Sequence, residues 1–347
     1  MREITYAQAV SEAIVLAMER QPEIFVLGEG VDDAAGIFNT TREAFLKFGS
    51  KRVEDTPLSE NALTGVVLGA AVMGMHPMLV YARDDFMLLA MDQIVNHAAK
   101  WSYTYGGRMS APIILRAIIG RGWGQGPQHS QSLQSLFVHI PGLKVVMPVT
   151  PYDAKGLLLS SFKEKCPVIF IEHRWLHKEI GDVPTEYYTI PLGSAKIMRS
   201  GDDVTIVAIS QMVLEAMKAA AILAEKGIKA EIIDLRSLKP WDKQTVLTSV
   251  TKTGHLVVAD TGHLMCGLAS EIAATVAEEA MSYLRAPIKR ISLAESPSPT
   301  SYKLEEFFYP QAGQIVSAVW EVLGKNQTQM KEIQPTEEYV KKFDGSF

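Results

Sequence analysis

The chain has 347 residues, of which 47% are hydrophobic and 21% are charged, and this length predicts two domains with apolar cores. Its formal net charge of −5, without a long run of one sign, argues against general affinity for nucleic acids or acidic membranes. Cys166 and Cys266 form no CxxC pair, which argues against a disulfide framework or a structural zinc site and predicts a reducing, cytoplasmic location.

Short apolar runs alternate with longer amphipathic stretches in the first half of the chain. The apolar runs predict strands at 24–28, 78–82, 112–118, 144–148 and 168–173. The amphipathic stretches predict helices at 6–20, 60–74, 86–101, 131–138 and 151–164. Runs such as VIFIE are apolar on both faces, as expected for parallel strands covered by helices on both sides. We therefore expect a doubly wound α/β domain over residues 1–180.

The composition changes after residue 180. Residues 181–202 are polar and rich in proline and glycine, which is typical of a connector with one short strand. A second alternation then predicts strands at 203–210, 229–235, 255–260 and 287–293 and helices at 212–227, 242–251, 267–284 and 313–324. This pattern indicates a second, smaller α/β domain over 203–325, followed by a polar tail at 326–347.

The N-terminal residues show no apolar signal core, and no stretch approaches the roughly 20 apolar residues that span a bilayer. We therefore expect neither a secretory leader nor a transmembrane segment. The most apolar run, APIILRAIIG, is interrupted by Arg116 and is too short to span a bilayer.

Glu60 is the first candidate for chemistry, because it stands at the start of an apolar helix just after the turn marked by Pro57 and Ser59. One interpretation is structural: Ser59 caps the helix and Glu60 complements its dipole. The other is functional: a carboxyl buried at a domain edge keeps its proton and donates it. The residues alone favour the structural interpretation.

A glycine-rich loop, RGWGQGPQHSQSL at 121–133, follows the expected strand at 112–118 and contains His129. Loops at the carboxyl ends of parallel strands are where α/β sheets bind ligands. The glycine spacing is not that of a dinucleotide fingerprint, and no GK[ST] follows as in a phosphate loop. The sequence supports a structural role and a catalytic role for His129 about equally.

Other polar positions have simpler explanations. Asp84 and Asp85 would cap the helix that follows them, and Phe86 would belong to the core or offer its ring to a ligand. His173 and His177 have the i, i+4 spacing of a metal pair, but no third ligand lies nearby. We therefore expect no metal site at these histidines.

Taken together, these segments resemble the β subunit of the thiamine diphosphate-dependent decarboxylating component of 2-oxoacid dehydrogenases, a family that includes pyruvate, branched-chain and acetoin enzymes. The similar segments lie between residue 1 and about residue 325. They are LGEGV, GIFNTT, RVEDTPLSE, MDQIVNHAAKW, YGGRMSAPIILR, PQHSQSL, IPGLKVVMPVTPYDAKGLL, CPVIFIEH, DVTIVA, IIDLRSLKP and FFYP. The resemblance implies a transketolase-like pyrimidine-binding domain followed by a transketolase C-terminal domain.

The resemblance also implies roles for individual residues. Glu60 corresponds to the glutamate that contacts N1′ of the cofactor's aminopyrimidine, with Leu58 beside it. Phe86 corresponds to the aromatic residue that stacks on that ring, and His129 to the histidine near the reacting carbon. In some members, backbone carbonyls bind a structural potassium ion, and the corresponding positions here are Ile113, Ser161, Phe162, Glu164 and Cys166. Arg83 and Asp84 depart from the family pattern, because many members carry less charge there.

The chemistry agrees with these roles. A carboxyl at position 60 that is buried and neutral near pH 7 would favour the imino form of the cofactor's pyrimidine, whose nitrogen then takes a proton from the thiazolium carbon. His129 would hydrogen-bond an oxygen of the substrate as charge shifts. A non-catalytic scaffold with the same fold is a further hypothesis, and the presence of Glu60, Phe86 and His129 argues against it.

One absence implies a partner. The family holds the cofactor's diphosphate through Mg²⁺ bound at a GDG motif, and no GDG occurs in this chain. The resemblance therefore implies an α subunit that carries this motif, an α2β2 assembly, and acyl transfer to a lipoyl group on a partner acyltransferase. The alternative is a split transketolase-like enzyme that moves a two-carbon unit between sugars.

Overall fold

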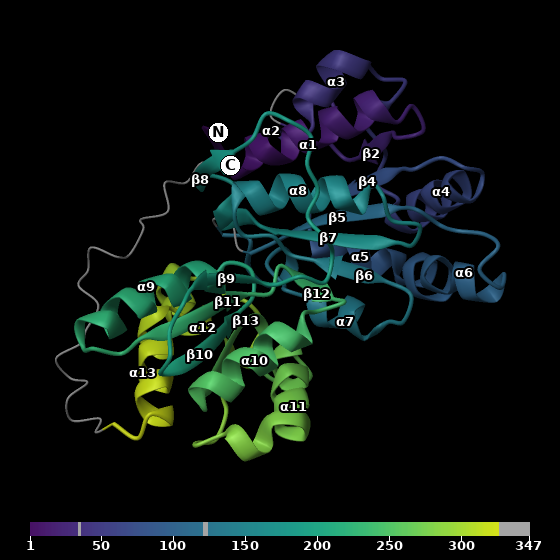
Figure 1. Cartoon of the computed structure of the whole chain (residues 1–347). Coiled ribbons are helices and arrows are strands. Elements are labelled where there is room, and N and C mark those ends of the chain that lie inside the picture. The colour runs from purple at the N-terminus through teal and green to yellow at the C-terminus, as the bar shows by residue number, and fades with distance from the viewer. Residues whose placement is uncertain (34–35, 121–123, 326–347) are drawn as a thin grey trace. The chain divides into compact units, whose positions relative to one another are not determined.

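The computed structural model describes residues 1–33, 36–120 and 124–325, in two compact units (Figure 1). Of the described residues, the first unit comprises 1–33, 36–120, 128–194 and 236–240. The second comprises 124–127, 195–235 and 241–325. The predicted polar tail at 326–347 lies outside the described residues. Among the residues described, no helix is long and apolar enough to cross a membrane.

The first unit is built on a seven-stranded sheet with the order β12-β6-β7-β5-β4-β2-β3. Neighbouring strands are parallel, except that β12 runs antiparallel to β6. The strands are β2 (Val26–Gly28), β3 (Val53–Glu54), β4 (Met78–Tyr81), β5 (Ile114–Ile119), β6 (Lys144–Val146), β7 (Val168–His173) and β12 (Ser237–Lys239). Every residue of β4, β5 and β7 is buried, as expected for strands covered on both faces.

Two long helices, α1 (Tyr6–Arg20) and α8 (Pro151–Ser161), pack against each other on one face of this sheet, and α3 (Arg42–Phe48) packs beside α1 (Figure 1). Each of the two long helices begins where the sequence allows it. Thr5 and Gln8 form a capping box before α1, and Thr150 caps α8 with Pro151 in its first turn.

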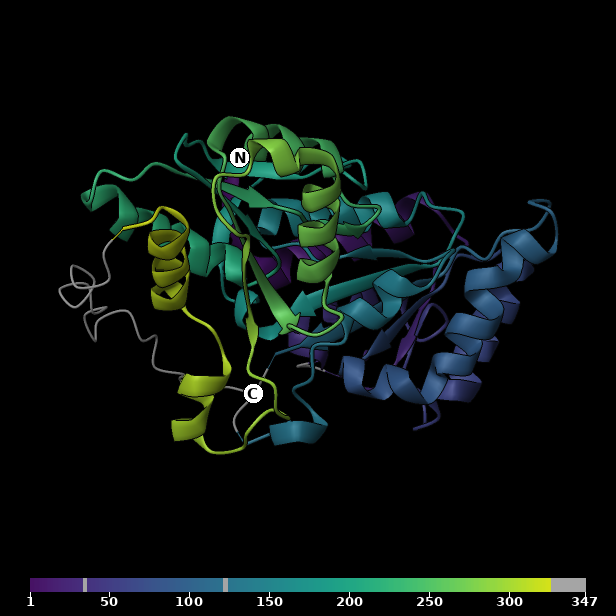
Figure 2. The same cartoon turned by 90° about the horizontal axis from the view of Figure 1, so that it is seen from below.

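The opposite face carries the segment 84–104 and α7 (Gln134–His139), as Figure 2 shows. The prediction of one regular helix at 86–101 was wrong. This segment comprises α5 (Asp84–Met87), 3₁₀ turns at Leu88–Ala90 and Ala98–Lys100, a π turn at Asp92–His97, and α6 (Trp101–Thr104). A π turn holds one extra residue, which apolar spacing does not show, and such turns are frequent at functional sites.

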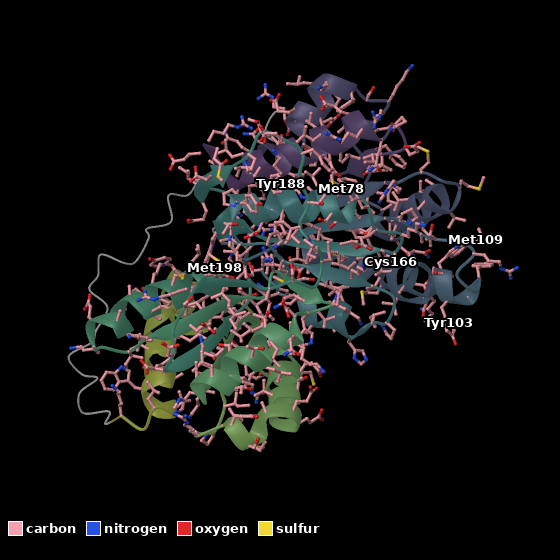
Figure 3. The ribbon with its side chains drawn as sticks, viewed as in Figure 1. Met78, Tyr103, Met109, Cys166, Tyr188 and Met198 are labelled. Carbon is pink, nitrogen blue, oxygen red and sulfur yellow. The ribbon has the colours of Figure 1, made fainter. Side chains whose placement is uncertain are left out.

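The remaining elements of the first unit are short or lie at its margin. They are α2 (Gly36–Asn39), α4 (Glu60–Val72) and the antiparallel pair β1 (Arg2–Thr5) and β8 (Ile180–Val183). The segment after β8 is attached to α8, because Tyr188 (labelled in Figure 3) stacks on Tyr152 with ring centroids 4.6 Å apart. The segment expected as a connector is therefore partly packed against the first unit.

The second unit has a five-stranded sheet with the order β14-β13-β10-β11-β9, in which β9 alone runs antiparallel to its neighbour. Its strands are β9 (Lys196–Arg199), β10 (Val204–Ala208), β11 (Ala230–Asp234), β13 (Leu256–His263) and β14 (Lys289–Leu293). Helices α9 (Met212–Glu225) and α13 (Ala312–Val322) pack together, as do α10 (Lys243–Thr253) and α11 (Leu268–Ala280). The short helix α12 (Tyr302–Phe308) precedes α13.

The strand β12 follows the second unit's β11 in the chain but pairs with β6 of the first unit. Arg236 donates from Nη1 to Asp153 Oδ1 at 2.8 Å, and Lys239 donates to the carbonyls of Val138 and Ile140 at 2.6 and 2.7 Å. These side-chain bonds hold the returning segment at the edge of the sheet.

Candidate functional site

The chain order reverses at β2, which has β3 on one side and β4 on the other. In open α/β sheets, ligands bind beyond the carboxyl ends of the strands at such a reversal. Gly28 ends β2 in close approach to β4, because a Cβ at this position would lie 2.4 Å from the Val80 carbonyl oxygen. The residues after β2 and β3 are therefore placed where a ligand would bind.

Glu60 is the first residue of α4 and is half-buried. Its carboxylate makes no hydrogen bond or ion pair with any described residue. Ser59 occupies the N-cap position, but its hydroxyl makes no capping hydrogen bond, so that part of the structural interpretation was wrong. Glu60 thus has its main chain fixed in a helix and its side-chain oxygens available.

Acidic groups surround Glu60. Burial raises the pKa of the Glu29 carboxyl, and repulsion from Glu60 and Asp55 raises it further. Asp55 accepts a hydrogen bond from the Gly30 amide at 2.6 Å, which holds the end of β2 against the segment before α4. Mutual repulsion among carboxylates favours a bound proton or a ligand that donates hydrogen bonds.

Phe86 and His129 lie together although 43 positions separate them in the sequence. Their ring centroids are 5.2 Å apart and the ring planes meet at 89°, an edge-to-face contact. Both residues are half-buried. Leu58, by contrast, is 78% exposed in this chain.

The interpretation of Asp84 and Asp85 as helix caps was wrong. The cap position of α5 belongs to Arg83, and neither carboxylate binds an amide of its own helix. Asp84 Oδ2 instead accepts from the Leu133 amide at 2.8 Å, and Asp85 Oδ1 accepts from Gln131 Nε2 at 2.8 Å and from the Gln131 amide at 3.3 Å. Both acids therefore bind the segment that follows His129.

Family models cover nearly the whole chain. The model for the transketolase pyrimidine binding domain matches residues 2–178, and the model for the transketolase C-terminal domain matches residues 193–315. The β subunit of acetoin:2,6-dichlorophenolindophenol oxidoreductase from Cupriavidus necator is 44% identical over 327 residues, which are 91% of this chain and 96% of that protein.

The chain belongs to the family of 2-oxoacid dehydrogenase E1 β subunits.

Other E1 β relatives share similar identity. The β-1 subunit of the mitochondrial pyruvate dehydrogenase E1 component from Arabidopsis thaliana is 41% identical, over 91% of this chain and 88% of that protein. The β subunit of 2-oxoisovalerate dehydrogenase from Bacillus subtilis is 38% identical, over 93% of this chain and 99% of that protein. A solved structure described as a split gene transketolase, inactive beta4 tetramer, shares the fold with a TM-score of 0.76 at 24% identity, over 92% and 98% of the two chains. Family membership implies thiamine diphosphate as the cofactor and an α subunit as the partner.

The five residues for which the resemblance predicts a potassium site, as in some members of the family, lie near the amino ends of β5 and β7. The Ile113 carbonyl accepts from the Val168 amide at 2.9 Å, which joins the residue before β5 to the start of β7. The other four residues lie at the end of α8 and in the loop that follows: Ser161, Phe162, Glu164 and Cys166 (labelled in Figure 3). The Ser161 carbonyl accepts from the Glu164 amide at 3.2 Å, so a potassium site at these carbonyls stays a prediction.

This E1 β subunit contains a buried charge network that was not predicted from the sequence. Arg116 of β5 donates from Nε and Nη2 to both carboxylate oxygens of Glu172 on β7, and His177 Nε2 lies 2.8 Å from Glu172 Oε2. Arg116 and Glu172 are wholly buried and His177 is 5% exposed. His173, the other member of the expected i, i+4 pair, packs at Gly120 instead. The only available signal was an arginine within an otherwise apolar strand.

Proposed function

We propose that this chain is the β subunit of a thiamine diphosphate-dependent 2-oxoacid dehydrogenase, which oxidatively decarboxylates a 2-oxo acid and passes the acyl group to a lipoyl group on an acyltransferase. The main observation is the half-buried Glu60 carboxylate, which has no partner among the described residues and stands at the carboxyl edge of the sheet. The E1 β relatives named above support the dehydrogenase over the split transketolase.

When bound, thiamine diphosphate supplies an electron sink for cleavage of the bond next to the substrate carbonyl. Glu60 would hold a proton at N1′ of the pyrimidine. Phe86 would offer its ring face to the pyrimidine. His129, held edge-on to Phe86, would donate a hydrogen bond to the substrate oxygen that gains charge.

The incompleteness of the site supports an α partner. Glu60 is only half-buried and Leu58 is 78% exposed in this chain, whereas the proposed chemistry requires a site closed to water. The chain also has no GDG motif for Mg²⁺. We therefore propose that the α subunit holds Mg²⁺ and the diphosphate, covers this edge of the sheet, and forms an α2β2 assembly. A cytoplasmic location stays a prediction from the sequence.

The substrate class has two branches. The pyruvate and 2-oxoisovalerate relatives favour a 2-oxo acid, whereas the 44% and 42% identical relatives are both named for acetoin. Both branches cleave a carbon–carbon bond beside a carbonyl group. The assembled enzyme should therefore be assayed with pyruvate, 2-oxoisovalerate and acetoin, and 2,6-dichlorophenolindophenol can serve as the electron acceptor.

The decisive experiment replaces Glu60 with Gln in the complex with the α subunit. Glu60→Gln should lower the thiamine-dependent rate by a factor of about 10²–10⁴, the usual contribution of a positioned acid or base. Glu43→Gln is the matched control, because Glu43 is an exposed acid in the first turn of α3. If Glu60 only complements a helix dipole, both variants will lose about 0.3–1 kcal/mol of stability and keep their activity. Activity with a two-carbon sugar donor, and none with the oxo acids or acetoin, would favour the split transketolase.

A further inference from the structure

Two buried carboxyls form an unusual pair at the start of α5. Asp84 is wholly buried and Asp85 is 8% exposed. Asp84 Oδ1 and Asp85 Oδ2 have no hydrogen-bond partner within the described part of the chain. Burial raises the pKa of the Asp84 carboxyl well above its usual range, and the neighbouring Asp85 raises it further, while the Leu133 amide and Arg83 act in the opposite sense.

This arrangement is costly for a packing role. Burying a polar group without full hydrogen bonding costs about 1–3 kcal/mol in proteins, and a charged group costs more. An apolar side chain would fill the same space without that cost. What these acids supply is acceptors: one oxygen of each binds the segment 131–133, which lies 46 to 49 positions further along the chain.

The bonds made by the acids join the two members of the aromatic pair. Phe86 directly follows Asp85, and His129 stands two residues before Gln131. On the other side of His129, Gly124 and Gly126 have φ of +67° and +55°, values that favour glycine. Asp84 and Asp85 therefore restrain the His129 segment at its downstream end.

We propose that Asp84 and Asp85 are positioning residues that hold the His129 imidazole edge-on to Phe86 by binding the segment 131–133. The proposal rests on the proposed function, since it assigns His129 to the same site. Asp84 acts through Oδ2, which accepts from the Leu133 amide, and a neutral side chain with an oxygen at this place can accept the same bond. Arg83 anchors the same turn, because its Nη1 donates to the Gly120 carbonyl at 2.8 Å, where β5 ends.

The test separates the acceptor from the charge. In the complex with the α subunit, Asp84→Asn gives a neutral side chain that keeps an acceptor oxygen. Asp84→Ala and Asp85→Ala remove the acceptor. Hydrogen exchange measured by mass spectrometry should be faster by a factor of ten or more in peptides covering 128–134 for both alanine variants. It should be unchanged for Asp84→Asn, and unchanged in β5 and β7 for all three variants.

Steady-state kinetics of the same variants provide a second measurement. The alanine variants should lower kcat by a factor of about 10–100 with little change in KM, because a displaced catalytic group affects the reaction more than binding. The kcat of Asp84→Asn should stay within a factor of about three of the wild-type kcat. Asp92→Ala is the control, because Asp92 is an exposed acid of the same helical segment whose described contacts are with its near neighbours Gln93, Asn96 and His97.

The outcomes are distinct. Unchanged exchange over 128–134 in both alanine variants would overturn the proposal, as would an Asp84→Asn variant as impaired as Asp84→Ala. Exchange that rises everywhere would show a general folding role and would equally overturn it. If the wild-type complex lacks thiamine-dependent activity, the proposed function fails, whereas the exchange measurement still tests whether the acids hold the segment.

Discussion

Replacing Glu172 with Gln should destabilise the first unit by roughly 3 kcal/mol. Burial alone would raise the pKa of Glu172, but attraction to Arg116 and hydrogen bonds from His177 and Arg116 outweigh it and lower the pKa from 4.5 to about 2. A fall of that size corresponds to roughly 3 kcal/mol of preference for the charged form in the folded state. Breaking a buried ion pair by removing one partner typically costs about 3–5 kcal/mol, which agrees.

A double variant tests the physical reason. Arg116→Met combined with Glu172→Met removes both charges at similar volume, and replacing a buried pair by apolar side chains is often neutral or stabilising. The double variant should therefore be more stable than either single variant. The control is Glu279→Gln in the exposed Lys243–Glu279 pair, whose side chains are 48% and 42% exposed, and it should change stability by less than about 1 kcal/mol.

Hydrogen exchange of the β5 and β7 amides in the assembled complex measures the free energy of opening at the site of the change. The pH dependence supplies a second signature. The stabilisation from Glu172 is present above about pH 4.5, the unfolded value, and is lost as pH falls through about 2. Glu172→Gln should lack this loss. A loss of stability below about 1 kcal/mol in Glu172→Gln would refute the reasoning. A double variant whose loss of stability equals the sum of the losses in the two single variants would refute it as well.

Three further predictions follow from other groups. Burial lowers the pKa of His76 to about 4, so the unfolded chain takes up a proton at this residue before the folded chain does as pH falls below 6.5. The free energy of unfolding should therefore fall by at most roughly 3 kcal/mol between pH 6.5 and 4. Urea titrations should show that this free energy depends less on pH in His76→Gln. Gly120→Ala should lower the midpoint of thermal unfolding more than Gly107→Ala, because both have positive φ but only at Gly120 would a Cβ meet another side chain, the His173 ring at 2.7 Å. Replacing potassium by choline should lower the same midpoint if carbonyls near Cys166 bind the ion, and equal midpoints in the two salts would contradict that site.

Much of the fold was predictable because local signals agreed with burial. The bounds of α1 at 6–20 and of β7 at 168–173 match the prediction, since the first has a capping box and the second is a β-branched and aromatic run. The irregular segment 84–104 and the return of β12 were not predictable. An extra residue in a π turn leaves no apolar pattern, and β12 is placed by Arg236 and Lys239 through distant partners.

The candidate site divides in the same way. Glu60, Phe86 and His129 could be proposed from the sequence, because the segments that contain them resemble the family. The acceptor role of Asp84 and Asp85 was hidden, because a helix cap and a long-range acceptor have the same residue types before a helix. Glu172 was hidden because its pairing with Arg116 depends on the register in which β5 and β7 align.

The two kinds of carboxyl in the first unit have opposite expected responses to the same substitution. Glu172 is wholly buried and bonded on both oxygens, so its charge is used within the fold, and glutamine there should cost stability. Glu60 is half-buried and unbonded among the described residues, so glutamine there should cost little stability and most of the activity. Because general destabilisation would affect both properties together, opposite effects in these two variants would separate the catalytic carboxyl from the structural one.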